Sequence, residues 1–199
     1  MKNYQVITID REYASGGREI AHRLGEICGL PVYGKELTEY VAGQLGVPVR
    51  GDQEKPTNSL LYSLSVFGQL YRGEMVTAPN EDKIKQGEQE LISKIGDFQK
   101  CIILGRCAGW TLRDRDDVLS IFVTANKEFR INRAVTEYGV EEAQVKNVVA
   151  KFDKKRGGFY HELTGGNWSE KKGYDIVMDS SRLGIDECVK VIAMLFDEK

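Results

Sequence analysis

Apolar positions along the chain fall into two patterns, short runs typical of strands and longer segments with helical spacing. Near the beginning, Tyr4–Ile9 alternates, is rich in β-branched side chains, and then meets a polar stretch that contains glycine. This pattern predicts a strand that runs into a loop. The next segment, Glu19–Cys28, has its apolar residues on one helical face and is followed by Gly29, so it predicts a helix with a glycine stop.

The same two patterns continue to the end of the chain. Further strands are predicted at Leu30–Tyr33, Cys101–Leu104, Val118–Val123 and Asp175–Met178. Further helices are predicted at Lys35–Leu45, Leu60–Leu70, Glu81–Phe98, Lys127–Tyr138, Glu141–Lys155 and Ile185–Phe196. Two segments that contain proline or several glycines predict a flexible connection at Val47–Asn58 and an irregular region at Gly157–Gly173.

The alternation of strands and helices from end to end decides the fold class. It predicts an α/β protein whose parallel sheet is covered by helices on both faces, in three layers. The length of 199 residues favours a single domain, 1–199, with room for a mobile insertion. The sequence contains no internal repeat and no low-complexity tract.

The composition narrows the classes of partner. The chain is 41% hydrophobic and 29% charged, with a net charge of −2, so nothing global points to nucleic acid or to a membrane surface. No apolar stretch approaches the roughly 20 residues that span a bilayer, and the first ten residues read as a strand and not as a secretion signal. The four cysteines are scattered without a CxxC pair, which disfavours zinc and disulfide frameworks and fits a reducing cytoplasm.

The sharpest chemical feature is a strand–loop–helix segment, Val6–Leu24, that reads VITIDREYASGGREIAHRL. The first N–H groups of a helix are unpaired and carry a partial positive charge, so they can bind phosphate. Gly16 and Gly17 allow a phosphate oxygen to approach the backbone closely, and Arg18 adds a fork of hydrogen-bond donors. The phosphate-binding residues predicted in this loop are Ser15, Gly16, Gly17, Arg18 and Glu19.

This loop departs from the standard pattern GxxxxGK[ST]. Gly17-Arg18 stands where Gly-Lys would be, the first glycine is absent, and Glu19-Ile20 replaces the hydroxyl residue that helps to hold magnesium. Magnesium would then be held by water, by ATP, or by another residue such as Ser15 or Asp10. Taken alone, the segment fits a tight glycine turn before a helix equally well.

Four segments in order resemble the cytidylate kinases and their relatives. ILGRCAGWTLRDRDDVLSIFVTANKEFRINR is similar to the second half of bacterial cytidylate kinases, in which a strand ends in Gly-Arg-Asp and a later helix begins with Arg-x-x-Arg. FDKKRGGFY carries the Asp-x-x-Arg of that family's lid, and YDIVMDSSRLGIDECV is similar to its last strand and helix. ITIDREYASGGREIAHRLGEICGLPVYGKEL looks like the cytidylate kinase-like branch, in which arginine replaces the loop lysine. The resemblance covers Val6–Val191 apart from the middle.

The resemblance implies a P-loop nucleoside-kinase-like fold and an ATP-dependent phosphotransferase. Its cofactors would be ATP and Mg2+, and its partner a small-molecule nucleotide, with CMP the leading acceptor. The region 59–98 corresponds to a helical insertion on the acceptor side, and 146–173 to a lid. Between Lys146 and Lys172 basic residues outnumber acidic ones, as a lid over phosphates requires.

The resemblance also assigns roles to individual residues. It implies catalytic roles for Arg18, Arg133, Asp153 and Arg156. It adds Arg130 and Arg133 to the loop residues as ligands of the donor phosphates. It places the acceptor at Lys35, Arg106 and Cys107. No residue is assigned as a metal ligand.

Each assignment has a structural alternative. Arg130 and Arg133 would equally serve as solvated residues or as partners of Glu128 and Glu137. Asp153 would either orient Arg156 or cap a helix turn. Lys154-Lys155 fits a surface run, His22 and His161 fit structural or surface positions, and Trp168 fits packing better than a lid tip. Arg106 favours function, because it follows a buried strand and a glycine at the edge where open α/β sheets bind ligands.

Two departures concern the acceptor. Cys107 replaces an aspartate that helps to bind the nucleotide in cytidylate kinases, and Gly34-Lys35-Glu36-Leu37 stands where the family has Asp-Ser/Thr-Gly-Ala. Three further readings therefore stay open: a degenerate kinase that senses nucleotide without transfer, a kinase of another small acceptor, and an interaction module. The sequence does not indicate an oligomeric state.

Overall fold

The computed structural model describes residues 3–44 and 81–196. Within these residues the chain forms a parallel sheet of five strands in the order β2-β3-β1-β4-β5. The strands are β1 (Val6–Arg11), β2 (Val32–Tyr33), β3 (Cys101–Leu104), β4 (Val118–Thr124) and β5 (Ile176–Asp179). The helices are α1 (Gly17–Cys28), α2 (Glu36–Gln44), α4 (Glu81–Phe98), α5 (Ala108–Thr111), α6 (Lys127–Thr136), α7 (Val145–Thr164), the 3-10 turn η1 (Trp168–Glu170), α8 (Ser180–Leu183) and α9 (Ile185–Phe196).

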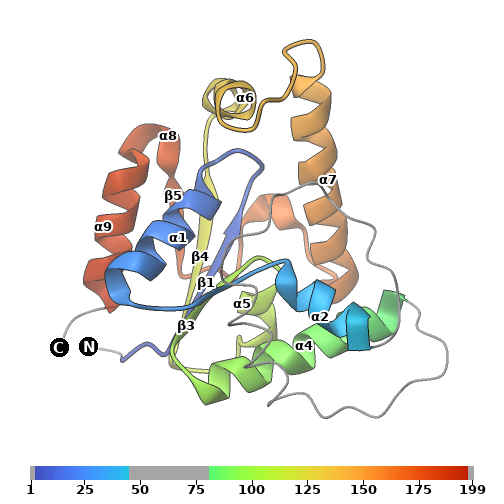
Figure 1. Ribbon diagram of the computed structural model, residues 1–199, viewed down its shortest axis with the longest axis vertical. Helices are drawn as coiled ribbons and strands as arrows, with labels where there is room; N and C mark the ends of the chain where they lie inside the picture. The colour runs from blue at the N-terminus through green and yellow to red at the C-terminus, as the bar shows by residue number, and fades with distance from the viewer. Residues whose placement is uncertain (1–2, 45–80, 197–199) are drawn as a thin grey trace.

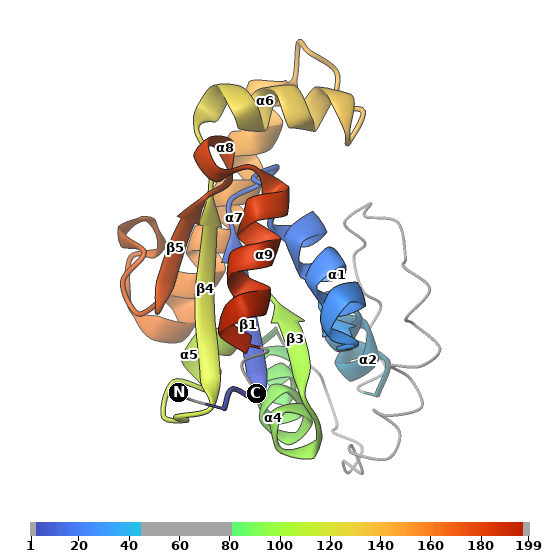
Figure 2. The same cartoon turned by 90° about the vertical axis from the view of Figure 1, so that its left-hand side faces the viewer.

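Helices cover both faces of the sheet, as the sequence predicts (Figures 1 and 2). On one face, Ile7 and Ile9 of β1 pack with α1 and α9. On the other face, Val6 packs with α2, α4 and α5. Successive residues of a strand point to opposite faces, so a strand buried on both sides must be apolar at nearly every position. This explains the continuous apolar runs of β3 and β4, and it confirms the three-layer α/β class.

A third apolar cluster lies above the carboxyl ends of the strands. It joins Tyr13 and Ala14, from the loop after β1, to Ala134 of α6 and to Val145 and Val149 of α7. Figure 1 shows α6 over the top of the sheet and α7 along its side. The cluster fixes both helices against the loop that the sequence singles out for phosphate.

Several predicted elements have the observed bounds, among them α4, β3 and α9. The irregular region predicted at Gly157–Gly173 is wrong in its first half, because α7 continues through it to Thr164 and ends at Gly165, which has φ 69°. Interior glycines weaken a helix by only about 1 kcal/mol each, and tertiary packing outweighs that cost here. The same helix begins at Val145, later than the predicted Glu141.

Two predictions, Val47–Asn58 and Leu60–Leu70, lie outside the described residues. Among the helices that the structure does describe, none combines the length and the apolar character needed to cross a bilayer.

Candidate functional site

The β1–α1 loop (residues 12–16) turns directly from the central strand into a helix. The Glu12 N–H donates to the Val123 carbonyl at 3.0 Å, which extends the β1–β4 pairing by one residue. The N–H and the hydroxyl of Ser15 then both donate back to the Glu12 carbonyl, at 3.3 Å and 2.9 Å. Gly16 is the N-cap of α1, with φ 82° and no side-chain cap. The first N–H groups of α1 thus have neither an intrahelical acceptor nor a capping side chain, as an anion site requires.

Gly16 of this loop and Gly17, the first residue of α1, are both needed for close packing. A Cβ at Gly16 would lie 2.8 Å from the Ile185 side chain at the start of α9. A Cβ at Gly17 would lie 2.6 Å from the Arg11 Cβ. Any side chain at either position would push the loop away from its neighbours, so the glycine pair seen in the sequence has a steric cause.

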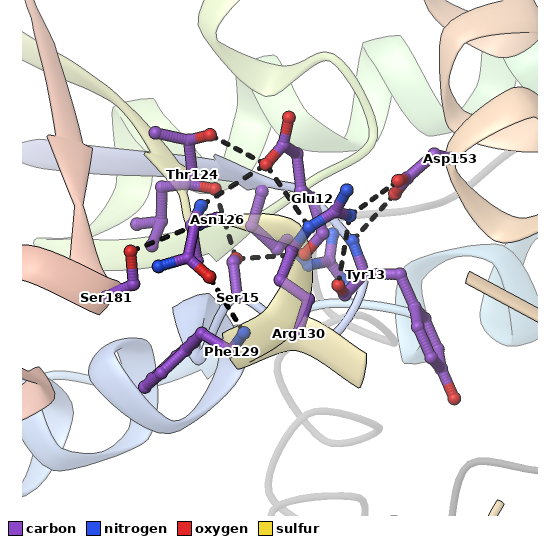
Figure 3. Close-up of polar contacts among 12 residues, drawn as sticks. Glu12, Tyr13, Ser15, Thr124, Asn126, Phe129, Arg130, Asp153 and Ser181 are labelled. Atoms are coloured by element: carbon purple, nitrogen blue, oxygen red, sulfur yellow. Dashed lines mark hydrogen bonds and ion pairs between the residues drawn. The ribbon is translucent and has the colours of Figure 1, made fainter. Parts of the chain in front are cut away.

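Acidic side chains pair with both arginines of α6. Arg133 Nη2 donates to Glu19 Oε2 at 2.8 Å, and the other Glu19 oxygen lies 2.5 Å from Arg23 Nη2. Arg130 Nη1 donates to Asp153 Oδ2 at 2.6 Å (Figure 3). The alternative partners that the sequence suggested for Arg130 and Arg133, Glu128 and Glu137, are therefore wrong. The observed partners lie in other helices: Glu19 is in α1 and Asp153 is in α7.

Asp153 joins α7 to the β1–α1 loop. Its second oxygen accepts the Tyr13 N–H at 2.8 Å, and the Tyr13 ring stacks on Phe152 with centroids 4.5 Å apart. Asp153 thus holds Arg130 and the loop backbone, which corrects the expectation that it orients Arg156 or caps a turn. Arg156 instead donates from Nη1 to the Arg11 carbonyl at 3.0 Å.

A pocket of about 250 Å³ opens beside the loop, between α2, the turn after β3 and α7. Its charged and thiol-bearing lining residues include Asp10, Arg11, Arg18, Lys35, Glu36, Glu39, Arg106, Cys107, Lys155 and Arg156. It therefore brings together Arg18, Arg156 and all three predicted acceptor residues. Arg130, Arg133 and Asp153 lie outside its lining.

The turn after β3 places Arg106 and Cys107 in left-handed conformations, with φ 61° and 52°. Arg106 Nη1 lies 3.6 Å from an oxygen of Glu88, whose side chain is only 3% exposed. The Thr38 hydroxyl also donates to Glu88. Burial raises the pKa of the Cys107 thiol, with the nearby Asp10 charge acting in the same direction, so the thiol stays neutral at physiological pH.

Sequence reasoning missed Arg11, which lines the pocket, and two residues that contact the lining from behind, Tyr174 and Glu88. Arg11 passes over Gly17 and reaches Gly105, Tyr174 donates its hydroxyl to Asp10 Oδ2 at 2.7 Å, and Glu88 supports Arg106. Burial raises the pKa of Asp10, an effect that the Tyr174 hydrogen bond partly offsets. One sequence signal could have found Arg11: the last residue of a strand that precedes a glycine loop lies at the ligand edge of a parallel sheet.

Two side chains near the expected magnesium position, Ser15 and Glu19, are engaged in other contacts. The Ser15 hydroxyl is within 3.1 Å of two carbonyl oxygens, and Glu19 lies between two arginines. Residues 3–44 and 81–196 contain no cluster of three or more His, Cys, Asp or Glu side chains that could hold a metal ion. Ser15 and Glu19 are therefore not open to a metal ion in this arrangement, whereas the Asp10 carboxylate lines the adjoining pocket.

Sequence comparison agrees with this arrangement. The model of the cytidylate kinase-like family matches residues 6–182. The chain belongs to this family. No curated protein is a significant match to the chain.

Several solved structures, kinases among them, have a fold similar to that of this family member. An uncharacterized protein from Eubacterium ventriosum has a TM-score of 0.73 at 23% identity, with 98% of this chain and 99% of that chain covered. Shikimate kinase from Bacteroides thetaiotaomicron has a TM-score of 0.53 at 12% identity, covering 97% and 98%. Shikimate kinase from Acinetobacter baumannii, in complex with shikimate, has 0.51 at 10%, covering 98% and 93%. At these identities the likeness is one of fold.

Proposed function

We propose that this cytidylate kinase-like protein is an ATP-dependent phosphotransferase that moves the γ-phosphoryl group to a small acceptor, with CMP the leading candidate among nucleoside monophosphates. One observation carries the proposal: Arg11, Arg18 and Arg156 line both the hollow over the β1–α1 loop and the adjoining pocket. A donor phosphate on the loop and an acceptor in the pocket would meet at these arginines. Phosphoryl transfer needs little beyond such positioning and charge neutralisation.

In this proposal the donor phosphates lie on Ser15–Glu19, with Arg18 supplying a formal charge and Arg133 beside the loop. The nearest atom of Arg133, Nε, is 3.9 Å from the Cβ position of Gly16. Arg156 would act on the transferring group from α7. The arginines would contribute charge neutralisation, and Mg2+ would be held by ATP, by water or by a carboxylate such as Asp10.

The acceptor would occupy the pocket against Lys35, Arg106 and Cys107. Leu104 of β3 lines this pocket, and the Glu88 carboxylate forms an ion pair with Arg106. The neutral Cys107 thiol offers no charge to a cytidine amino group, so selectivity for cytosine would have to come from other residues. The regions 59–98 and 146–173 are proposed as acceptor-side insertion and lid of one domain. The setting would be cytoplasmic, which fits the four scattered cysteines without a CxxC pair.

An ADP-release assay over a panel of nucleoside monophosphates tests the proposal. We expect ATP-dependent turnover with at least one acceptor, CMP first. Tight ATP binding with no turnover on any nucleoside monophosphate or other small phosphorylated or hydroxyl acceptor would contradict it.

A second candidate is a nucleotide sensor that binds without transfer. It is favoured by Glu19, which stands at the position of the magnesium-binding hydroxyl and is held by Arg23 and Arg133. Such a sensor would bind ATP equally with and without magnesium and would never release ADP. Metal-dependent turnover would exclude it.

A further inference from the structure

Glu12 stands where the standard loop has its first glycine, yet its backbone does not need one. Among the described residues, the non-glycine positions with left-handed backbone are Ala14, Arg106, Cys107 and Lys171. The sharp turn of this loop therefore falls at Ala14 and Gly16, with φ 59° and 82°. A side chain at Glu12 costs no backbone strain, so the position is available for another task.

The Glu12 carboxylate contacts four residues from three other parts of the chain. Its Oε2 accepts the Thr124 hydroxyl at 2.7 Å and the Ala125 N–H at 3.2 Å (Figure 3). The same oxygen lies 3.6 Å from Arg130 Nε, and Oε1 lies 3.5 Å from Lys171 Nζ. Only 18% of the side chain is exposed. A glycine could make none of these contacts.

These contacts form a network that is balanced in charge. Glu12 and Asp153 are negative, and Arg130 and Lys171 are positive, so the formal charges cancel. Arg130 Nη1 also lies 3.3 Å from the Tyr13 carbonyl. Arg130 thus has two carboxylates and a loop carbonyl as its partners. These contacts connect α6 to the β1–α1 loop and to α7.

Lys171 gives independent support. Its backbone is left-handed, with φ 54°, a conformation that persists in a residue with a side chain only where the surroundings fix it. Its Nζ meets Glu12 and also donates to the Thr124 hydroxyl at 2.9 Å. The strained turn after η1 thus delivers an ammonium group to the same carboxylate.

We propose that Glu12 is a positioning residue. Its carboxylate takes over from the missing glycine the task of shaping the β1–α1 loop, and it orients Arg130, which in turn contacts the loop backbone. The catalytic part of this inference rests on the proposed function, whereas the loop-shaping part does not. Deleting the carboxylate would remove one of the two carboxylate partners of Arg130 and would remove the side-chain contacts of the loop to Thr124 and Ala125 at the end of β4.

The test compares Glu12→Gly, which restores the standard glycine, with Glu12→Gln and with the exposed control Glu142→Gln. Amide hydrogen exchange of residues 13–17 is measured on ligand-free protein. We expect about tenfold faster exchange in Glu12→Gly, because opening of a loop follows the loss of its local contacts. Glu12→Gln should lie between, since it keeps an acceptor for Thr124 and Ala125 but loses the charge. The control should match the parent.

Kinetics separate positioning from simple stability. At temperatures where each variant is fully folded, we expect kcat/KM for ATP to fall by about tenfold or more in Glu12→Gly, since small misplacements of reacting groups cost up to about a hundredfold. KM for the acceptor should stay within about twofold, and Glu12→Gln should recover part of the loss.

Each outcome decides the proposal. If Glu12→Gly has the same amide exchange rates at residues 13–17 and the same kcat/KM for ATP as the parent, the proposal is wrong. If that variant does not fold, parental values in Glu12→Gln would overturn it instead. If the parent neither binds ATP nor releases ADP, the proposed function fails, and the exchange of residues 13–17 still decides whether Glu12 shapes the loop.

Discussion

At the scale of single residues, backbone strain collects around one place. The four non-glycine residues with left-handed backbone in the described part of the chain are Ala14, Arg106, Cys107 and Lys171. One lies in the β1–α1 loop, two line the pocket, and the last contacts Glu12. Such conformations cost about 1–3 kcal/mol each and survive where the surrounding structure requires them. Their gathering supports the assignment of the loop and the pocket as one functional site.

The first prediction at this scale concerns Arg18. Arg18→Ala should reduce ATP affinity more than tenfold, because a charged hydrogen bond contributes roughly 1.5–3 kcal/mol. Arg18→Lys should recover part of the affinity, since it keeps the charge and loses the bidentate fork. Titration calorimetry with ATP measures both. Arg113→Ala, which removes an arginine at the opposite end of β4, is the control and should bind like the parent. If Arg18→Ala binds ATP as tightly as the parent does, the hypothesis of a phosphate-binding loop is wrong, and the chain shares only its fold with ATP-binding kinases.

Asp10 gives a prediction on pH. Its pKa is raised by burial, so its ionised form is less stable in the folded protein than in the unfolded chain. The parent should therefore lose stability as pH rises above the ordinary carboxyl pKa of 3.8 and through the higher folded value. Asp10→Asn keeps an oxygen for the Tyr174 hydroxyl and has no charge to bury.

The melting temperatures of the two proteins should thus agree near pH 4 and separate above it. At pH 7 Asp10→Asn should melt higher than the parent, because the parent alone has to bury a carboxylate charge there. Scanning calorimetry between pH 4 and 8 measures the gap. A gap that is constant with pH would show that ionisation of Asp10 is not its cause.

At the scale of elements, α7 is the segment that sequence patterns describe least well. It carries Asp153 and Arg156 toward the loop, and its interior contains Gly157 and Gly158. The Cβ position of Gly157 is 3.7 Å from the Trp168 ring, and nothing lies within 4 Å of the Cβ position of Gly158. Packing on Trp168, which is itself buried, explains why the helix continues through both glycines.

Gly158→Ala should stabilise the protein, because alanine in a helix interior is favoured over glycine by about 0.8–1.0 kcal/mol and the site is open. We expect a rise of about 2–4 °C in the melting temperature. Gly17→Ala is the matched contrast: its added methyl group would meet Arg11 Cβ at 2.6 Å, so that variant should melt lower. A Gly158→Ala protein that melts below the parent would mean that α7 needs flexibility at this turn to fold.

At the scale of the whole molecule, the strand order places β1 between β3 and β4. Arg11 at the end of β1 therefore reaches the turn after β3, and the loop that follows contacts the end of β4. This central position makes the loop the place where pocket, α6 and α7 meet. A ligand bound there contacts several elements at once and should stabilise the whole fold.

Heat protection tests that expectation. ATP at 100 times its dissociation constant should raise the free energy of unfolding by about 2.7 kcal/mol through mass action. Thermal shift measurements with ATP, CMP and sulfate would show it, and the Arg18→Ala protein should lose the response to ATP while keeping its own folding transition. An interaction module without a nucleotide site predicts no protection by any of the three.

Local pattern alone predicted the strands and most of the longer helices, and it pointed to the β1–α1 loop. A strand that is buried on two faces requires a continuous apolar run, as at Cys101–Leu104. An amphipathic helix requires apolar residues at helical spacing, as at Glu81–Phe98. The glycine pair and Arg18 between β1 and α1 pointed to phosphate because helix N-termini have the same unpaired donors in every protein. These features depend on neighbours within a few residues.

The tertiary structure decided which charges meet. Asp153 bonds to Tyr13 across 140 positions of the chain, and Glu12 bonds to Thr124 across 112. Such partners depend on the order of strands in the sheet and on the helix that each strand delivers, which no local period encodes. For the same reason the sequence could propose Arg130 as a phosphate ligand, whereas only the folded chain encloses it between two carboxylates.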